Sequence, residues 1–136
     1  MARFYEELAG RLVEGARATL EEAGVSDVDS FEVPGAFELP LVASYAARCG
    51  RYAAVVCLGA VIRGETDHYR YVCGEAARGI EQVQLDTGVP CGFGVLTVDT
   101  MDQALERVTG GSKRDTGRSA AEAALAALAI KRKLGL

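Results

Sequence analysis

Near the start of the chain, apolar residues recur at a four-residue spacing. The positions are Phe4, Leu8, Leu12, Ala16 and Leu20. This spacing lays one apolar stripe along a helix, so it predicts a helix from Phe4 to about Ala23, which Gly24 ends.

A short strand and a second helix are predicted next. Ser30 to Val33 has the composition of a short strand, and Pro34-Gly35 forces a turn after it. The second helix is expected from Phe37 to Cys49, where Pro40 is compatible only with a position near the helix start.

The middle of the chain carries the clearest strand pattern. Tyr52 to Gly59 is a continuous apolar run between Gly50 and Gly59, as in a parallel strand that is covered on both faces. A long helical pattern follows from about Asp67 to Asp86, and Gly88-Val89-Pro90 ends it.

The last part of the chain repeats this alternation. Cys91 to Val98 is predicted as a strand, and Thr100 to Val108 as a short helix with Thr100 as its cap. A loop rich in Gly, Ser and charged residues, from Thr109 to Gly117, leads to a final helix from Arg118 to Lys133.

Strands that alternate with helices predict an α/β fold with right-handed crossovers. We expect a three-layer α/β/α sandwich around a flavodoxin-like parallel sheet, in a single domain of residues 1–136. Such a unit normally begins with a strand, whereas this pattern begins with a helix at the third or fourth residue. The N-terminal strand is therefore expected to be absent.

The charge balance excludes some classes of protein. A net charge of −4 argues against a general nucleic-acid or membrane-surface binder, since either needs a cationic face. The sequence has neither an apolar run of about 18 residues nor a signal-peptide pattern, so a cytoplasmic protein is predicted.

The four cysteines are Cys49, Cys57, Cys73 and Cys91. They form no CxxC pair and have apolar or small neighbours in the sequence. They are predicted to be buried, reduced thiols, so neither a disulfide nor a metal site is expected.

The only histidine lies where a ligand is expected. In open parallel sheets, ligands bind beyond the carboxyl ends of the strands, and His68 follows the central strand by way of the Gly64-Glu65-Thr66 turn. Backbone N–H groups at the start of a helix can hold a phosphate, and a histidine there can transfer protons near neutral pH. The alternative is that Thr66 only caps the helix and that His68 is solvated or packed.

Two further segments carry candidate chemistry. Phe37 and Glu38 follow a Pro-Gly turn, where they could bind a polyol, or instead form a hydrophobic staple and a favourable helix-dipole contact. Arg107 precedes a loop that contains Lys113, Arg114 and Arg118. Its guanidinium suits phosphate oxygens, although an isolated arginine there is more often a helix-dipole partner.

Together these segments resemble the lumazine synthase family over the chain from Arg3 onward. The matching stretches are Val33-Pro-Gly-Ala-Phe-Glu38, Gly59-Ala-Val-Ile-Arg-Gly-Glu-Thr66 with His68, Gly88-Val-Pro with Phe93-Gly-Val-Leu-Thr97, and Ala104-Leu-Glu-Arg107. The resemblance implies a transferase of riboflavin biosynthesis. Such an enzyme joins 5-amino-6-(ribitylamino)uracil to 3,4-dihydroxy-2-butanone 4-phosphate and uses neither a redox cofactor nor a metal.

The resemblance also implies roles for individual residues. His68 would shuttle protons, and Arg107 would grip the phosphate. The substrate-binding residues would be Phe4, Ala36, Phe37, Glu38, Val61, Ile62, Gly64, Glu65, Thr66, Phe93 and Arg107. Phosphate or sulfate would occupy the turn at Gly64-Glu65-Thr66. In this family the site lies between subunits, so the neighbouring subunit would supply Phe93 and Arg107.

Departures from the family pattern leave two questions. Arg3-Phe4-Tyr5 lacks the usual asparagine, and Lys113, Arg114 or Arg118 would have to replace a displaced basic residue of the loop. The longer loop after Arg107 favours a pentamer over a sixty-subunit shell.

An inactive assembly scaffold on the same fold is the alternative function. A nucleotide-binding domain is disfavoured, because the chain has no GxGxxG or Walker loop.

Overall fold

The computed structural model describes residues 5–136, and two parallel strands form the centre of this part of the fold. Strand β1, Val55–Ile62, pairs in parallel with β2, Cys91–Val98, from Val55 opposite Cys91 to Ile62 opposite Val98. The first strand was predicted three residues too early. Its actual limits follow the partner strand, because the glycine at 59 continues the ladder instead of ending it.

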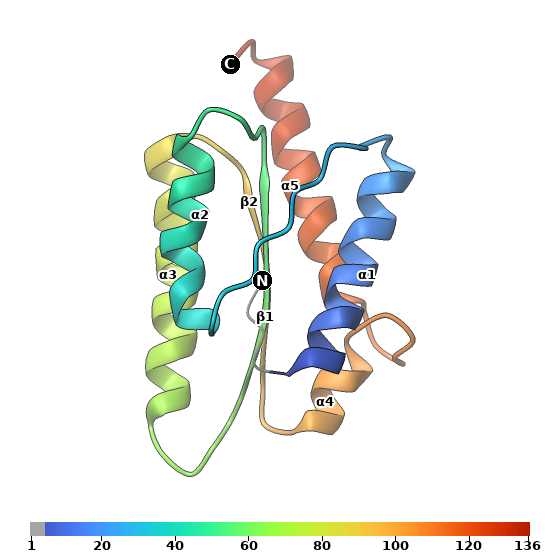
Figure 1. Ribbon diagram of the computed structural model, residues 1–136, viewed down its shortest axis with the longest axis vertical. Helices are drawn as coiled ribbons and strands as arrows, with labels where there is room; N and C mark the ends of the chain where they lie inside the picture. The colour runs from blue at the N-terminus through green and yellow to red at the C-terminus, as the bar shows by residue number, and fades with distance from the viewer. Residues whose placement is uncertain (1–4) are drawn as a thin grey trace.

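Helices cover both faces of this sheet (Figure 1). Helices α1, Glu6–Glu22, and α5, Thr116–Lys133, lie on one face. Helices α2, Leu39–Arg48, and α3, His68–Thr87, lie on the other. The short helix α4, Met101–Glu106, follows β2, and a 3-10 turn η1, Ala36–Glu38, precedes α2. The predicted three-layer α/β/α arrangement with a parallel sheet is confirmed.

Two hydrophobic clusters fill the spaces between these layers. Odd-numbered strand residues such as Cys57 and Val95 pack toward α2 and α3, whereas even-numbered ones such as Leu58 and Leu96 pack toward α1 and α5. This alternation buries both faces of each strand, and it explains the nearly unbroken apolar sequence of the two strands.

Helix ends agree well with their sequence signals. Gly24 and Gly88 have φ of 83° and 71°, in the left-handed region that favours glycine at the end of a helix. The Thr100 hydroxyl accepts a hydrogen bond of 3.2 Å from the Gln103 N–H, as expected of a cap. Helix α5 begins at Thr116, two residues earlier than predicted, because the Asp115 carboxylate accepts from the Arg118 N–H at 3.1 Å.

The predicted strand from Ser30 to Val33 is wrong. Among residues 30–33 only Val33 forms a bridge, and within residues 5–136 no ladder is built on this segment. A strand needs a neighbour at about 4.8 Å, and a groove separates this segment from β1. The second helix also differs from the prediction, since residues 36–38 form the 3-10 turn and the α-helix begins only at Leu39.

A close approach of α1 and α5 depends on Gly117. A Cβ atom there would overlap the Leu12 carbonyl oxygen, whereas a Cβ on Gly74 in α3 would meet no atom within 4 Å. Gly117→Ala is therefore expected to lower the free energy of unfolding by about 1–3 kcal/mol. Gly74→Ala, the matched control, should raise it by about 1 kcal/mol through helix propensity. Urea unfolding of both variants measures this, and equal effects would contradict the close contact.

All four cysteines are free thiols, but they are not all buried as predicted. Cys57 and Cys91 are buried, and burial raises their pKa to about 12 and about 11. Cys49 is exposed, because it follows the last turn of α2 in the loop before β1, and a hydrogen bond to the Arg51 backbone lowers its pKa.

The thiols should therefore react at different rates. At pH 7.5 we expect Ellman's reagent to modify Cys49 first, and to reach Cys57 and Cys91 only after unfolding, because the thiolate is the nucleophile. A Cys49→Ser variant should lose the fast phase. A fast phase that persists in this variant would contradict the assignment.

Candidate active site

The turn that follows β1 brings the predicted phosphate-binding residues and the histidine together. Residues 63–68 are exposed, and α3 begins at His68 with Asp67 as its N-terminal neighbour. The Asp67 side chain does not cap the helix. Instead, the His68 N–H donates a long hydrogen bond of 3.4 Å to the Thr66 hydroxyl. The Thr66 hydroxyl therefore lies at the start of α3, close to the capping position predicted for it.

The charged side chains around this turn disfavour the binding of an anion by the turn alone. Glu65 and Asp67 are both exposed carboxylates that would repel an anion. The nearest cation, Arg63, is engaged elsewhere, and Arg70 lies two helix positions after His68, so the two side chains do not share a face. An anion at this turn needs a cation from another segment or another subunit.

Three elements meet around Arg63. Its guanidinium lies 3.6 Å from the Asp99 carboxylate and 5.4 Å from the centre of the Tyr69 ring. Tyr69 also interacts with Cys73 and Thr97, and burial raises the pKa of its hydroxyl. These contacts tie the ends of β1 and β2 to the first turn of α3, which carries His68.

No role was predicted for Arg63 and Asp99, although their positions in the sequence carry a signal. Each is the first residue after one of two paired strands, and Ile62 lies opposite Val98 in the register. Their side chains therefore leave the sheet at the same level. Recognising the parallel pair from sequence would have predicted the contact.

The turn before α2 places Phe37 and Glu38 on the α3 side of the sheet. Turn η1 contacts both α3 and β1. Ala36 is buried in the same cluster as Val61, while the Phe37 ring remains 58% exposed. The Glu38 carboxylate folds back toward Gly35. Phe37 thus offers an open apolar face, beside a carboxylate with no hydrogen bond to another side chain among residues 5–136.

Val61 and Ile62 occupy opposite faces of β1. Val61 is buried with Ala36 on the α2 and α3 face, and Ile62 packs partly against the α1 and α5 cluster. Their side chains therefore do not line one common pocket within the protomer. Their backbone groups, at the carboxyl end of the strand, remain the part that can face a ligand.

Phe93 is not brought to His68 within one chain. It lies opposite Cys57 in the register, five residues before the end of the paired strands, or about 16 Å along the sheet. Its ring is 42% exposed in a strand that is otherwise nearly all buried. Phe93 is therefore a surface group that can serve a neighbouring molecule. Phe4 lies outside the described residues.

Arg107 lies at the end of α4 and is half-buried. Its Nη1 donates to the Gln103 carbonyl at 2.8 Å and lies 3.4 Å from a Glu106 carboxylate oxygen. The carbonyl contact is the helix-terminus interaction that the sequence offers as the alternative role of Arg107. Since the guanidinium has five N–H donors, others remain for an anion.

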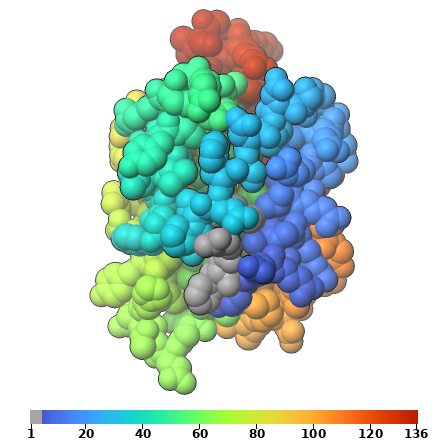
Figure 2. All heavy atoms as spheres, viewed as in Figure 1, coloured from blue at the N-terminus to red at the C-terminus, as the bar shows by residue number. Residues whose placement is uncertain are grey.

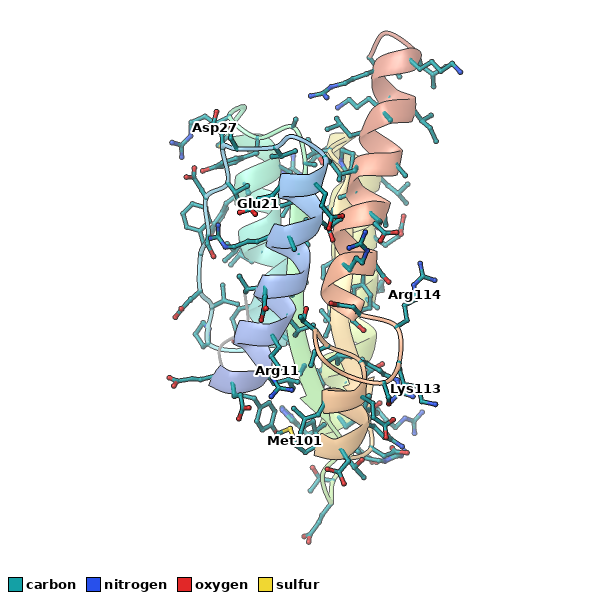
Figure 3. All side chains as sticks on the ribbon, turned by 90° about the vertical axis from the view of Figure 1, so that its right-hand side faces the viewer. Arg11, Glu21, Asp27, Met101, Lys113 and Arg114 are labelled. Carbon is teal, nitrogen blue, oxygen red and sulfur yellow. The ribbon has the colours of Figure 1, made fainter. Side chains whose placement is uncertain are left out.

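Of the three cations that could replace the displaced basic residue, Lys113, Arg114 and Arg118, the last lies in the first turn of α5, and two are engaged with other side chains. Arg118 lies 3.0 Å from a Glu22 carboxylate and 2.8 Å from that of Glu122, and Arg114 donates to the Ser119 hydroxyl at 2.7 Å. The Lys113 ammonium has no partner within the described part of the chain. Figure 3 shows Lys113 beside α4, at the end of the molecule where both strands finish.

His68 lies at the start of a helix beyond a parallel strand, while Phe37 and Phe93 are exposed at the surface. This arrangement fits a site shared between copies of the chain. A family model for 6,7-dimethyl-8-ribityllumazine synthase matches residues 1–132. The chain belongs to that family. Lumazine synthases are transferases of riboflavin biosynthesis that assemble as oligomers. The match also covers Arg107 and Phe93, and the strand register places Phe93 away from the turn within one protomer.

No helix of residues 5–136 is long and apolar enough to cross a membrane. In the same part of the chain, no three side chains of His, Cys, Asp or Glu are grouped as metal ligands would be.

Proposed function

We propose that the turn from Gly64 to His68 and turn η1 of one subunit form the lumazine synthase active site with Phe93 and Arg107 of a neighbouring subunit. The observation that carries this proposal is the lack of an available positive charge at the turn. The turn exposes a histidine and a helix start but flanks them with the carboxylates of Glu65 and Asp67. A phosphorylated substrate therefore needs a cation that this subunit's own turn does not offer.

Each group has a chemical role in the reaction. The helix start and Thr66 hold the phosphate of 3,4-dihydroxy-2-butanone 4-phosphate, and Arg107 balances its charge. Glu38 accepts hydrogen bonds from the ribityl hydroxyls of the uracil substrate, and Phe37 packs against its apolar edge. Backbone groups at Val61 and Ile62 meet the pyrimidine ring.

His68 moves the protons in this scheme. Imine formation between the 5-amino group and the ketone releases water, and elimination then expels phosphate and leaves a new carbonyl after tautomerisation. Attack of the ribitylamino nitrogen on that carbonyl closes the ring with loss of a second water and gives 6,7-dimethyl-8-ribityllumazine. Each stage needs a proton to leave or reach a substrate heteroatom or carbon. A histidine one turn from the phosphate can accept and return it. Holding the two substrates together supplies the larger part of the rate.

Lys113 is the loop cation that best replaces the displaced basic residue of the family pattern. Arg114 and Arg118 are engaged with Ser119, Glu22 and Glu122, whereas the Lys113 ammonium is available among the described groups. In an assembled ring it would add a second positive charge near the phosphate.

A pentamer is the assembly that we propose. Helix α2 and the turn before it expose an apolar stripe at four-residue spacing, made of Phe37, Leu41 and Tyr45, each more than half exposed. Such a stripe is typical of an interface. The longer loop after Arg107 favours a free pentamer over a closed shell. We also propose a cytoplasmic location, because the family is one of metabolic enzymes that act on small molecules. Nothing in residues 5–136 or in the family match favours an inactive scaffold.

The test is turnover by the assembled protein. Both substrates are added to purified protein, and the lumazine product is followed by absorbance and fluorescence. Appearance of product with release of one phosphate per turnover is expected. Absence of product from a sample that is oligomeric by ultracentrifugation would refute the active-enzyme proposal.

A further inference from the structure

The start of helix α3 is not held by an ordinary cap. Asp67, the residue before the helix, makes no capping hydrogen bond through its side chain, and the contact from the His68 N–H to the Thr66 hydroxyl is long, at 3.4 Å. A good cap ties up N–H groups at a helix start and also restrains its first turn. Here the remaining N–H groups stay available for a phosphate, but the first turn needs its restraint from elsewhere.

The turn that leads to the helix supplies little restraint. Residues 63–67 are all exposed, and Figure 2 shows this part of the chain, in light green, projecting at the lower end of the molecule. Its backbone is fixed at one end, where the N–H of Arg63 donates to the Val98 carbonyl at 2.9 Å. Residues 64–67 then lead to His68. The position of His68 relative to the sheet is therefore set by contacts of the helix itself.

Tyr69 makes those contacts in the first turn. Of residues 68–71, only Tyr69 is partly buried, and it packs against the core cluster that contains Val61. The other three residues of the turn are exposed. The side chain of Tyr69 also interacts with Thr97 of β2 and with Cys73, one turn further along the helix. Tyr69 is thus the side chain that joins the start of α3 to the sheet.

Arg63 and Asp99 restrain this ring from the strand ends. The Arg63 guanidinium lies 5.4 Å from the centre of the Tyr69 ring, within the range of a cation–π contact, and 3.6 Å from the Asp99 carboxylate. The Arg63 and Asp99 side chains are 56% and 61% exposed, so their ion pair adds little to the stability of the fold. Its effect is local, because it holds a guanidinium over the ring that positions His68.

We propose that Arg63 and Tyr69 are positioning residues for His68: Arg63, held by Asp99, keeps the Tyr69 ring against the sheet and thereby fixes the first turn of α3. Neither side chain touches a substrate in this scheme. A helix start that is held from its side keeps free N–H donors and a fixed histidine together, as a phosphate site with proton transfer requires. The catalytic consequence rests on the proposed function, whereas the placement of His68 does not.

The mobility of His68 gives a test that needs no turnover. His68 is the only histidine, so protein labelled with ¹⁵N-histidine gives one backbone amide signal in NMR spectra. In the assembled parent protein, the order parameter of this amide should be about 0.85. In Arg63→Met, which keeps the side-chain length without the charge, it should fall below about 0.6, and Tyr69→Leu should behave alike.

Two matched variants control for unrelated effects. Arg78→Met removes a shorter ion pair, of 2.7 Å to Glu75, from the same helix, and it should leave the order parameter of His68 unchanged. Tyr69→Phe keeps the ring under the guanidinium and should also preserve it. Ultracentrifugation checks that each variant assembles. Arg63→Met decides the matter if Tyr69→Leu does not fold, because Arg63 is exposed.

Kinetics then test whether the restraint matters for the reaction. Arg63→Met should lower kcat about tenfold, because a small displacement of a catalytic group is costly, and should change KM for the uracil substrate less than about twofold. Added to His68→Ala, the same substitution should cause no further loss of kcat. Two residues that act separately would instead multiply their losses.

The outcomes separate this inference from the proposed function. An unchanged order parameter in Arg63→Met would overturn the inference, even in an active enzyme. An equal fall in Arg78→Met would overturn it too, because any lost ion pair on α3 would then have the same effect. A further tenfold loss of kcat in the double variant would show that Arg63 does not act through His68. A parent protein without turnover would refute the proposed function and leave the NMR result to decide the placement of His68.

Discussion

Replacing His68 by alanine is expected to lower kcat about 100-fold, the lower end of the range for general acid–base catalysis. The effect is limited because holding two substrates in one site supplies most of the rate. His68 is exposed, and within residues 5–136 its imidazole makes no hydrogen bond, while its backbone N–H donates to the Thr66 hydroxyl. The variant should therefore fold and assemble normally, and steady-state product formation measures the loss.

A second substitution separates proton transfer from simple contact. His68→Gln keeps a polar side chain of similar length but cannot take up a proton near neutral pH, so it should be as slow as the alanine variant. Arg70→Ala, on another face of the same helical turn, is the matched control and should keep the parent rate. A His68→Gln enzyme with the parent rate would show that this side chain only packs or donates a hydrogen bond.

The sequence predicts the helices of this fold better than its sheet. A helix carries its own signals, such as the stripe from Leu8 to Leu20 and the glycine that ends it. A strand is defined by what pairs with it, and residues 30–33 have the right composition but no ladder. The observed limits of β1 also differ from the predicted ones, because they are set by pairing with β2.

The candidate site shows the same difference between local features, which the sequence predicts, and contacts between distant segments, which it does not. The turn from Gly64 to His68 is local in sequence, so its position beyond a strand could be predicted from the order of elements. Phe93 and Arg107 are different, because nothing in the pattern of one chain says which molecule they serve.

Replacing Arg107 by alanine is expected to raise KM for the phosphorylated substrate about 10- to 100-fold and to change KM for the uracil substrate little. The reason is that Arg107 meets only the phosphate in the proposed site. The variant also loses the contact of 2.8 Å to the Gln103 carbonyl, which stabilises the end of α4. Arg107→Lys separates the effects, because it keeps the charge and loses the planar fork. Equal losses for both substrates would contradict the assignment.

Mixing the two impaired variants, at a concentration of the phosphorylated substrate below the raised KM of Arg107→Ala, tests whether the site is shared. If His68 and Arg107 come from neighbouring subunits, a 1:1 mixture of His68→Ala and Arg107→Ala chains, unfolded and reassembled together, forms about one quarter of its sites with both residues intact. Activity should then rise above that of either variant alone. If both residues served the same site from one chain, every site in the mixture would lack one of them. No gain on mixing, with mixed assembly verified by mass, would therefore place Arg107 with its own His68 and refute the shared site.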